Sequence, residues 1–410
     1  MEVVILGKGK SGKSAGKLLE KLGYNIIYYD DKEKGELPEK PKFVVKSPGI
    51  PQNHPVVNFY KKKGVEIIGE VELAGKFLKG KIVGITGTNG KTTTTALIYH
   101  GLKKLWKNGK VFIGGNYGIP VSEFATETEN SSISVIELSS YQIEDLKNFK
   151  CEISVILNIT PDHLNRYKDF NGYKEAKLKL IKHTTGKVIL NKDDKTLKNL
   201  KGDNFLYFSM KERGDIFYER NFITIGNSRI DVSSLPLSGY HNIQNIMASI
   251  LVIRELGFSV SEFLNAIKDF KGLEHRLEFV REIKGVKFIN DSKSTNVDSL
   301  EKALLSFERV VLIAGGKDKG IDFSPLKDIV RNKVKKLIAI GETAPMFKSI
   351  FDTVTEVEIK DTLKDAVISA FNSSKSGDIV LFSPGCSSFD MFKNFEERGK
   401  IFKQIVKEIE

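Results

Sequence analysis

A glycine-rich segment with a lysine and adjacent threonines forms the clearest chemical pattern in the sequence. Residues 86–93 read Thr-Gly-Thr-Asn-Gly-Lys-Thr-Thr, between an apolar run at 81–86 and a helix-like stretch that reaches about residue 106. A strand, a glycine turn and a helix in this order present backbone N–H groups to phosphates. Lys91 would reach the β- and γ-phosphates, and a threonine hydroxyl would ligate Mg²⁺. The segment predicts an ATP-binding loop, formed by Gly87, Thr88, Asn89, Gly90, Lys91, Thr92 and Thr93.

This loop departs from the strict Walker spacing, because Ile85 stands where that pattern has glycine. A structural glycine turn is therefore the alternative interpretation. The preceding strand, the lysine and the hydroxyl all favour nucleotide binding.

A second glycine pattern lies near the start of the chain. Gly7, Gly9 and Gly12 follow an apolar run at 3–6 with G-x-G-x-x-G spacing, and Asp30 ends the next apolar run. Such glycines let the backbone approach a diphosphate at a helix N-terminus, and an acid at this place can hold a ribose. The pattern predicts a nucleotide-diphosphate site. A tight structural turn and a triphosphate loop ending in Lys13-Ser14 are the alternatives.

Three further side chains are candidates from their positions. Glu137 ends an apolar run at 133–137, as an acid that holds Mg²⁺ beside a phosphate loop does, although it would also suit a surface acid at a strand end. Asn242 and Asn245 lie three residues apart at the start of an apolar helix, so both amides could reach one ligand. Helix capping is the alternative for that pair.

Strand-turn-helix units must position these residues, and they recur along the whole chain. Expected strands lie at 3–6, 26–29, 81–86, 133–137, 153–158, 187–191, 286–290, 310–314, 336–340 and 379–383, with short β segments at 204–231 and a last helix from about residue 389. A new unit starts near residue 79, and residues 270–273 resemble a linker. The pattern predicts an α/β protein with three domains in series: a Rossmann-like domain at 1–78, a P-loop ATPase-like domain at 79–271 and a Rossmann-like domain at 272–410.

Composition excludes several classes of protein. The chain has 410 residues, 64 Lys+Arg and 52 Asp+Glu, and 40% of its residues are hydrophobic, which is typical of a soluble multidomain protein. No apolar run is long enough to cross a bilayer. The excess of lysine is spread evenly, unlike a nucleic-acid surface. We expect a reduced, cytoplasmic monomer with no nucleic-acid or membrane partner, because the two cysteines lie far apart and no targeting segment is evident.

From the phosphate loop onward the sequence resembles the Mur ligase family, the ATP-dependent amide-forming enzymes of peptidoglycan precursor synthesis. The loop at 86–93 matches the ATP signature of that family. Further matches follow in family order at residues 115–118, 137–142, 158–164, 175–179, 239–245, 273–276 and 290–296. Residues 47–50 and 383–399 are similar to the members that add D-glutamate.

This resemblance implies roles that the residues alone do not show. Lys91, His163 and Lys177 would be catalytic, and Thr92, Glu137, His163 and Lys177, the last as a carbamate, would hold two Mg²⁺ ions. Asn242 and Asn245 would contact the adenine, Arg276 a phosphate and Asp291 the ribose of ATP. The UDP substrate would bind in the first domain, with contributions from the second, at Gly7, Gly9, Lys10, Ser11, Gly12, Asp30, Ser47, Gly49, Asn116 and His163. The amino acid would bind in the third domain at Lys293, Thr295, Lys319, Ser388, Phe389 and Phe395.

The implied reaction is the ATP-dependent addition of D-glutamate to UDP-N-acetylmuramoyl-L-alanine through an acyl phosphate. Addition of another amino acid by a sister or folylpolyglutamate-type ligase is the nearest alternative. A nicotinamide-dependent dehydrogenase and a nucleic-acid-coupled ATPase are alternatives from other classes, but both leave the C-terminal third without a role. Without the resemblance, we would interpret His163 as an ordinary loop histidine and Lys177 as a solvated lysine. Phe389 and Phe395 would be interpreted as core residues of the last helix.

Overall fold

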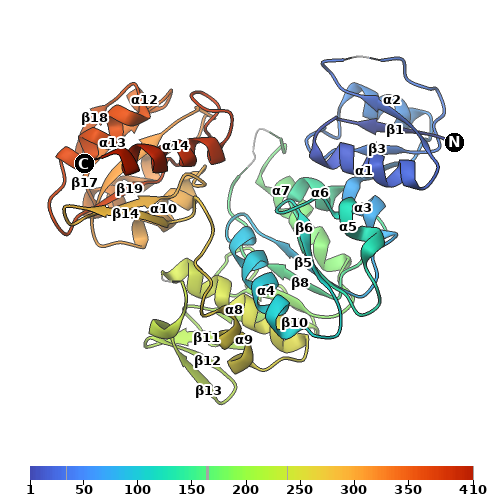
Figure 1. Cartoon of the computed structure of the whole chain (residues 1–410), viewed down its shortest axis with the longest axis horizontal. Helices are drawn as coiled ribbons and strands as arrows, with labels where there is room; N and C mark the ends of the chain where they lie inside the picture. The colour runs from blue at the N-terminus through green and yellow to red at the C-terminus, as the bar shows by residue number, and fades with distance from the viewer. Residues whose placement is uncertain (34, 163–165, 238, 410) are drawn as a thin grey trace. The chain divides into compact units, whose positions relative to one another are not determined.

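The computed structural model describes residues 1–33, 35–162, 166–237 and 239–409. It contains three largely parallel sheets that are flanked by helices (Figure 1). The chain divides into two compact units, one formed by Met1–Pro236 with Asn242–Phe270 and the other by Leu237–His241 with Lys271–Glu410. The predicted α/β class is therefore confirmed, with three strand-helix sheets in series.

The first sheet has the order β2-β1-β3-β4, and all its pairs are parallel. Its strands are β1 (Glu2–Leu6), β2 (Asn25–Tyr29), β3 (Val44–Lys46) and β4 (Ile67–Gly69), with helices α1 (Lys10–Lys21), α2 (Pro55–Lys62) and α3 (Glu70–Gly75). The chain leaves β1 toward β2 on one side and returns to β3 on the other. Loops after β1 and β3 therefore meet where parallel sheets usually bind ligands.

The second sheet has the order β13-β12-β11-β10-β9-β8-β5-β7-β6. Its parallel part comprises β5 (Lys81–Thr86), β6 (Val111–Gly115), β7 (Ile133–Glu137), β8 (Ile153–Ile156), β9 (Val188–Asn191), β10 (Phe205–Ser209) and β11 (Ile216–Glu219), and the antiparallel strands β12 (Phe222–Ile225) and β13 (Ser228–Asp231) extend it. Its helices are α4 (Lys91–Leu105), α5 (Val121–Phe124), α6 (Ser140–Glu144), α7 (Phe170–Lys182), α8 (Tyr240–Glu255) and α9 (Val260–Ile267). Because β5 lies between β7 and β8, the loops that follow these three strands are neighbours.

The third sheet has the order β14-β15-β19-β16-β17-β18, and only the β14–β15 pair is antiparallel. Its strands are β14 (Glu278–Ile283), β15 (Val286–Asn290), β16 (Val310–Gly315), β17 (Val334–Ile340), β18 (Glu356–Ile359) and β19 (Ile379–Phe382). Its helices are α10 (Val297–Leu305), α11 (Lys327–Lys333), α12 (Ala344–Phe351), α13 (Leu363–Asn372) and α14 (Phe395–Glu408). Every residue of β16 is buried, as expected where helices cover both faces of a parallel sheet.

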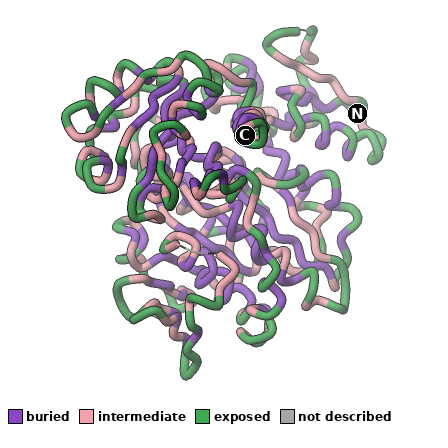
Figure 2. Tube along the Cα trace, turned by 60° about the vertical axis from the view of Figure 1, so that its left-hand side comes forward, coloured by how far each residue is buried: buried purple, intermediate pink, exposed green. Residues whose placement is uncertain are grey.

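Figure 2 shows long buried stretches of the chain in its interior and exposed stretches mainly at the outer bends of the trace. No helix of the described residues is long and apolar enough to span a membrane.

The expected start of the last helix was wrong. Helix α14 begins at Phe395 instead of about residue 389, because the side chain of Asn394 caps it by accepting from the Glu397 backbone N–H at 2.7 Å. Phe389 consequently lies in a turn, with 70% of its surface exposed, and is not a core residue.

Candidate active site

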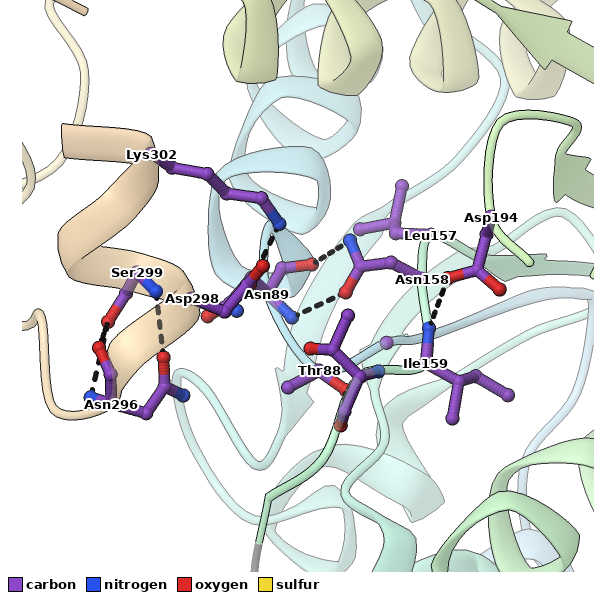
Figure 3. A network of polar contacts seen from close by, with 12 residues as sticks. Thr88, Asn89, Leu157, Asn158, Ile159, Asp194, Asn296, Asp298, Ser299 and Lys302 are labelled. Atoms are coloured by element: carbon purple, nitrogen blue, oxygen red, sulfur yellow. Dashed lines mark hydrogen bonds and ion pairs between the residues drawn. The ribbon is translucent and has the colours of Figure 1, made fainter. Parts of the chain in front are cut away.

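The glycine loop after β5 is held in place by the loop after β8. The Asn89 backbone N–H donates to Asn158 Oδ1 at 2.8 Å, and Asn158 Nδ2 donates back to the Asn89 carbonyl at 3.1 Å (Figure 3). The Thr88 N–H donates to the Asn158 carbonyl at 2.9 Å. Gly87 and Gly90 adopt positive φ values of 154° and 85°. The loop is therefore a preformed turn at the N-terminus of α4, which suits phosphate binding.

Two lysines point at one carbonyl oxygen of this loop. Lys91 Nζ donates to the carbonyls of Gly87 and Thr88, both at 2.8 Å. Lys177 Nζ, from α7, also donates to the Gly87 carbonyl at 2.8 Å. The structure therefore brings the two predicted catalytic lysines together at the predicted phosphate site.

Lys177 lies in an environment that disfavours its charged form. Its side chain is buried, and burial followed by repulsion from Lys91 lowers its pKa well below the usual value for lysine. The ring of Tyr173 lies 4.8 Å from its Nζ. A lysine with a lowered pKa is a nucleophilic neutral amine for a larger fraction of the time.

Glu137 has a carboxylate oxygen available for a cation. This buried side chain accepts from Asn116 Nδ2 at 2.6 Å through Oε1, and its Oε2 has no hydrogen-bond partner among the described residues. The Asn116 backbone N–H also donates to the Glu137 carbonyl at 2.8 Å. Buried carboxylates need a partner, so Oε2 suits a hard cation such as Mg²⁺.

The described residues include no group of three or more His, Cys, Asp or Glu side chains that could hold a metal ion without further ligands. His163, which was predicted as a ligand, lies outside the described residues. The hydroxyl of Thr92 and the phosphates of a nucleotide could complete the coordination of a cation at Glu137, since Mg²⁺ is usually bound by few protein ligands.

The two predicted adenine-contacting asparagines lie beside the loop. Asn245 Oδ1 accepts from Thr94 Oγ1 at 3.3 Å, and Asn245 Nδ2 donates to Asn242 Oδ1 at 3.4 Å. A Cβ atom on Gly90 would lie 2.4 Å from Asn245 Oδ1. Asn245 therefore packs against Gly90 and the start of α4, a proximity that the spacing of the two asparagines did not reveal.

In the first sheet, the Gly7–Gly12 turn packs against the loop after β3. Ser47 Oγ donates to the Gly7 carbonyl at 3.2 Å, and a Cβ on Gly12 would clash with that same carbonyl at 2.0 Å. Asp30 accepts from the backbone N–H groups of Lys32 and Lys8, and these two bonds lower its pKa. Of the other residues predicted for this site, Gly9, Lys10 and Gly49 are exposed, and Ser11 is half-buried.

In the third sheet, Asp291 is the most perturbed of the predicted site residues. Its Oδ2 accepts from Ser383 Oγ at 2.8 Å and its Oδ1 from the Leu277 N–H at 3.3 Å. Burial raises its pKa to about 7, against the opposing effect of these bonds and of Arg276. Arg276 and Asp291 therefore lie near each other in the same unit, as their predicted roles at one nucleotide require.

The predicted amino-acid residues are spread over the loops of this sheet. Lys293 Nζ lies 3.7 Å from the centre of the Phe395 ring, Ser388 is buried, Thr295 is half-buried and Lys319 is exposed. Lys293 and Phe395 of this set therefore contact each other.

Sequence reasoning assigned no role to two polar residues that organise these loops, although both lie in segments that match the family. Asn158 supports the phosphate loop, and Arg398 is a buried arginine that donates to the carbonyls of Ser292 and Cys386 at 2.8 and 3.1 Å. Burial lowers the pKa of Arg398 to about 10. An arginine on the second turn of a helix that is otherwise amphipathic carries no local signal for such a role.

Two family models match the chain, "Mur ligase middle domain" at residues 85–253 and "Mur ligase, glutamate ligase domain" at residues 275–386. Curated relatives named UDP-N-acetylmuramoylalanine–D-glutamate ligase match over the full length. The relative from Caldicellulosiruptor saccharolyticus is 38% identical, over 100% of this chain and 99% of its own. The relative from Aquifex aeolicus is 40% identical, over 99% and 98%.

Solved structures share the fold at lower identity. UDP-N-acetylmuramate-alanine ligase MurC from Thermotoga maritima superimposes with a TM-score of 0.66 at 21% identity and covers 99% of both chains. MurF ligase from Thermotoga maritima, solved in complex with ADP, gives a TM-score of 0.65 at 20% identity over 99% of this chain and 95% of its own.

Proposed function

Because the chain belongs to the Mur ligase family, we propose that it joins D-glutamate to UDP-N-acetylmuramoyl-L-alanine and converts ATP to ADP and phosphate. The observation that carries this proposal is the full-length similarity, at 38–40% identity, to relatives that bear the name of this ligase. The dehydrogenase and nucleic-acid-coupled ATPase alternatives do not account for a match over the whole chain. The protein is thus an ATP-dependent acid–amino-acid ligase of peptidoglycan precursor synthesis.

We assign one substrate to each predicted domain. Residues 1–78 bind the UDP moiety, residues 79–271 bind ATP, and residues 272–410 bind D-glutamate. The two glycine turns at the carboxyl ends of β1 and β5 support the first two assignments, because each lies at a reversal of strand order. The protein acts as a cytoplasmic monomer in this proposal.

The reaction has two steps. An oxygen of the alanyl carboxylate attacks the γ-phosphorus of ATP, and the bond from phosphorus to the bridging oxygen breaks, which leaves an acyl phosphate and ADP. The D-glutamate amine then attacks the acyl carbon, loses a proton and expels phosphate. A carboxylate is repelled by a triphosphate, so the protein must supply positive charge and hold the reacting atoms in line.

Lys91 is the residue of the chain that is best placed to supply this charge. Its ammonium group already lies at the mouth of the loop, where it donates to the carbonyls of Gly87 and Thr88. When ATP binds, the ammonium group exchanges these carbonyls for β- and γ-phosphate oxygens. The N-terminus of α4 adds a second source of positive potential, because the helix dipole has its positive end there.

The residues around Glu137 fit Mg²⁺, because its buried Oε2 lacks a partner within the described chain and the hydroxyl of Thr92 follows the loop. Mg²⁺ bound there would offset the charge of the phosphates. A second ion would be held by His163 and by Lys177 as a carbamate.

The lowered pKa of Lys177 supports this carbamate. The neutral Nζ attacks the carbon of carbon dioxide, a C–N bond forms, and the nitrogen loses a proton to give a group with one negative charge. An anionic oxygen ligand suits Mg²⁺, whereas an ammonium group would repel it. The Gly87 carbonyl that now accepts from Nζ keeps this side chain aimed at the phosphate loop.

The other predicted residues complete the proposed site. Asn242 and Asn245 contact the adenine, Arg276 a phosphate and Asp291 the ribose. Lys293 and Lys319 pair with the two carboxylates of D-glutamate, since cationic side chains bind carboxylates with charge-assisted hydrogen bonds. Thr295, Ser388, Phe389 and Phe395 surround the same amino acid, and the residues predicted around Gly7, Asp30, Ser47 and Asn116 receive the UDP substrate.

Release of ADP and phosphate tests the function. With UDP-N-acetylmuramoyl-L-alanine, Mg²⁺ and ATP, we expect turnover with D-glutamate and none with L-glutamate, L-lysine, meso-diaminopimelate or D-alanyl-D-alanine. Turnover with one of the other amino acids would assign a sister specificity. ATP hydrolysis that ignores the muramoyl substrate would contradict the proposed ligase.

A further inference from the structure

The loop after β3, residues 47–50, is held by an arginine of the neighbouring sheet's domain. Arg166 Nη1 donates to the Gly49 carbonyl at 3.1 Å, and Nη2 donates to the carbonyls of Ile50 and Pro48 at 3.1 and 3.4 Å. One guanidinium thus binds three successive backbone carbonyls. A lysine could not reproduce this planar, forked set of donors.

Arg166 is itself fixed in orientation. Its guanidinium lies 4.5 Å from the centre of the Tyr141 ring, and Nη2 lies 3.9 Å from a carboxylate oxygen of Glu144. Only 13% of the side chain is exposed. Stacking on an aromatic face and exclusion of water both strengthen the contacts that the guanidinium makes.

A buried lysine makes a second connection between the same two segments. Lys46 Nζ donates to the Ile50 carbonyl at 2.9 Å and lies 2.8 Å from Asp145 Oδ2, just after α6. Gln52 Nε2 donates to the other oxygen of Asp145 at 2.6 Å. The backbone carbonyls of the loop therefore accept hydrogen bonds from two cationic side chains, Arg166 and Lys46.

The residues that Arg166 connects lie near the two predicted nucleotide-binding loops, one after β1 and the other after β5. On one side, Ser47 donates to the Gly7 carbonyl in the first glycine turn. On the other side, Arg166 stands in the chain between Thr160, whose N–H donates to Thr88 Oγ1 at 3.0 Å, and α7, which carries Lys177. Arg166 therefore lies close in sequence both to Thr160 and to the start of α7.

We propose that Arg166 is a positioning residue, which sets the loop that receives the UDP substrate against the domain that holds the γ-phosphate of ATP. This role rests on the proposed function, because it assigns UDP to the first sheet. Arg166 contacts backbone carbonyls, the Tyr141 ring and the Glu144 carboxylate, which are all groups of the protein. Its loss should therefore misplace the substrate carboxylate without removing any contact to ATP.

The test compares Arg166→Ala and Arg166→Lys with a matched control, Lys147→Ala. Lys147 Nζ also joins the two domains, 3.3 Å from Glu66, but both side chains are about half exposed and lie away from the loop. We measure KM for UDP-N-acetylmuramoyl-L-alanine, kcat, the Kd values of UDP and ADP, and the thermal unfolding temperature.

For Arg166→Ala we expect KM for the UDP substrate to rise and kcat to fall by about tenfold each, since hydrogen bonds to a charged group are lost. The Kd of UDP should rise, and the Kd of ADP should stay within about twofold of the wild-type value. Arg166→Lys should have KM and kcat values between those of Arg166→Ala and wild type. If the alanine variant does not fold, the lysine variant tests the positioning role. Lys147→Ala should behave as wild type.

Unchanged KM and kcat in both Arg166 variants would overturn the positioning role, and so would an equal loss of ADP affinity. Wild-type turnover with an amino acid other than D-glutamate would contradict the proposed function and leave the Arg166 comparison valid, because KM for the UDP substrate is still measured. Wild-type protein that binds no UDP would overturn both proposals.

Discussion

The chemistry of the candidate site depends on which charged groups are removed from water. Lys91 and Lys177 share the Gly87 carbonyl as acceptor, and the buried one of the two has the lowered pKa. Glu137 keeps one carboxylate oxygen without a partner in the described part of the chain. Desolvated groups of this kind lower the free energy of unfolding, and they are typical of sites that bind a ligand.

At Lys177, replacement by alanine should lower kcat by roughly 100-fold or more, because an anionic ligand beside the phosphates is lost. Added short carboxylates, such as formate or acetate, should partly restore turnover by occupying the same space. The measurement is phosphate release against carboxylate concentration, with Lys174→Ala as a control, because the half-buried Lys174 of α7 donates to Asn171 Oδ1 at 3.0 Å. Wild-type rates in Lys177→Ala would remove the carbamate role.

Asp291 predicts a pH dependence of stability. Its pKa is about 7 in the folded chain, against about 4 in an unfolded chain. Between these values the folded state binds a proton that the unfolded state lacks, so this group makes stability fall as the pH rises from about 4 to 7. The asparagine of Asp291→Asn cannot titrate. The unfolding temperature of this variant relative to that of wild type should therefore be higher at pH 8 than at pH 5.

Calorimetric unfolding at several pH values measures this difference, with Asp328→Asn, an exposed acid of the same domain, as the control. Parallel curves for wild type and Asp291→Asn would show that the Asp291 carboxyl does not titrate in this range.

At the scale of elements, glycine turns at the ends of parallel strands set the positions of the loops. The phosphate loop follows β5, and the loop after β8 holds it through Asn158. Helix α7 carries Lys177, whose Nζ donates to the Gly87 carbonyl of the same loop. The sheet order places these three elements side by side although they are distant in sequence.

Gly90→Ala tests this geometry. Gly90 has φ of 85°, and an added Cβ would lie 2.4 Å from Asn245 Oδ1. We expect strain and displacement of about 1–3 kcal/mol, which corresponds to a loss of roughly 10- to 100-fold in ADP affinity by titration calorimetry. Gly257→Ala is the matched control, since Gly257 has φ of 94° but open space around its Cβ position. Equal affinities in the two variants would contradict the role of Gly90 in shaping the loop, since Gly257 lies outside it.

At the scale of the whole molecule, residues proposed for one nucleotide belong to two units of the chain. Lys91 and Asn245 lie in the first unit, and Arg276 and Asp291 lie in the second. A ligand that engages both sets must hold the two units in one arrangement.

We therefore expect the radius of gyration from solution scattering to fall when a non-hydrolysable ATP analogue and the UDP substrate are added together. Lys91→Ala, which should bind the analogue weakly, is the control and should show a smaller change. An identical radius with and without both ligands in the wild-type protein would contradict ligand-driven closure.

The sequence by itself determined the two glycine turns after β1 and β5 and the α/β class, because the residues that shape a strand-turn-helix unit are neighbours in the chain. Only the tertiary structure decided the environment of single side chains. Lys177 meets Gly87 across 90 residues, and burial raises the pKa of Asp291 against the opposing effect of the hydrogen bond from Ser383. The sequence likewise did not predict the exposed turn at Phe389 or the hydrogen bonds from Arg166 to the carbonyls of residues 48–50. Desolvation and long-range pairing depend on what the fold brings together, and local spacing does not encode them.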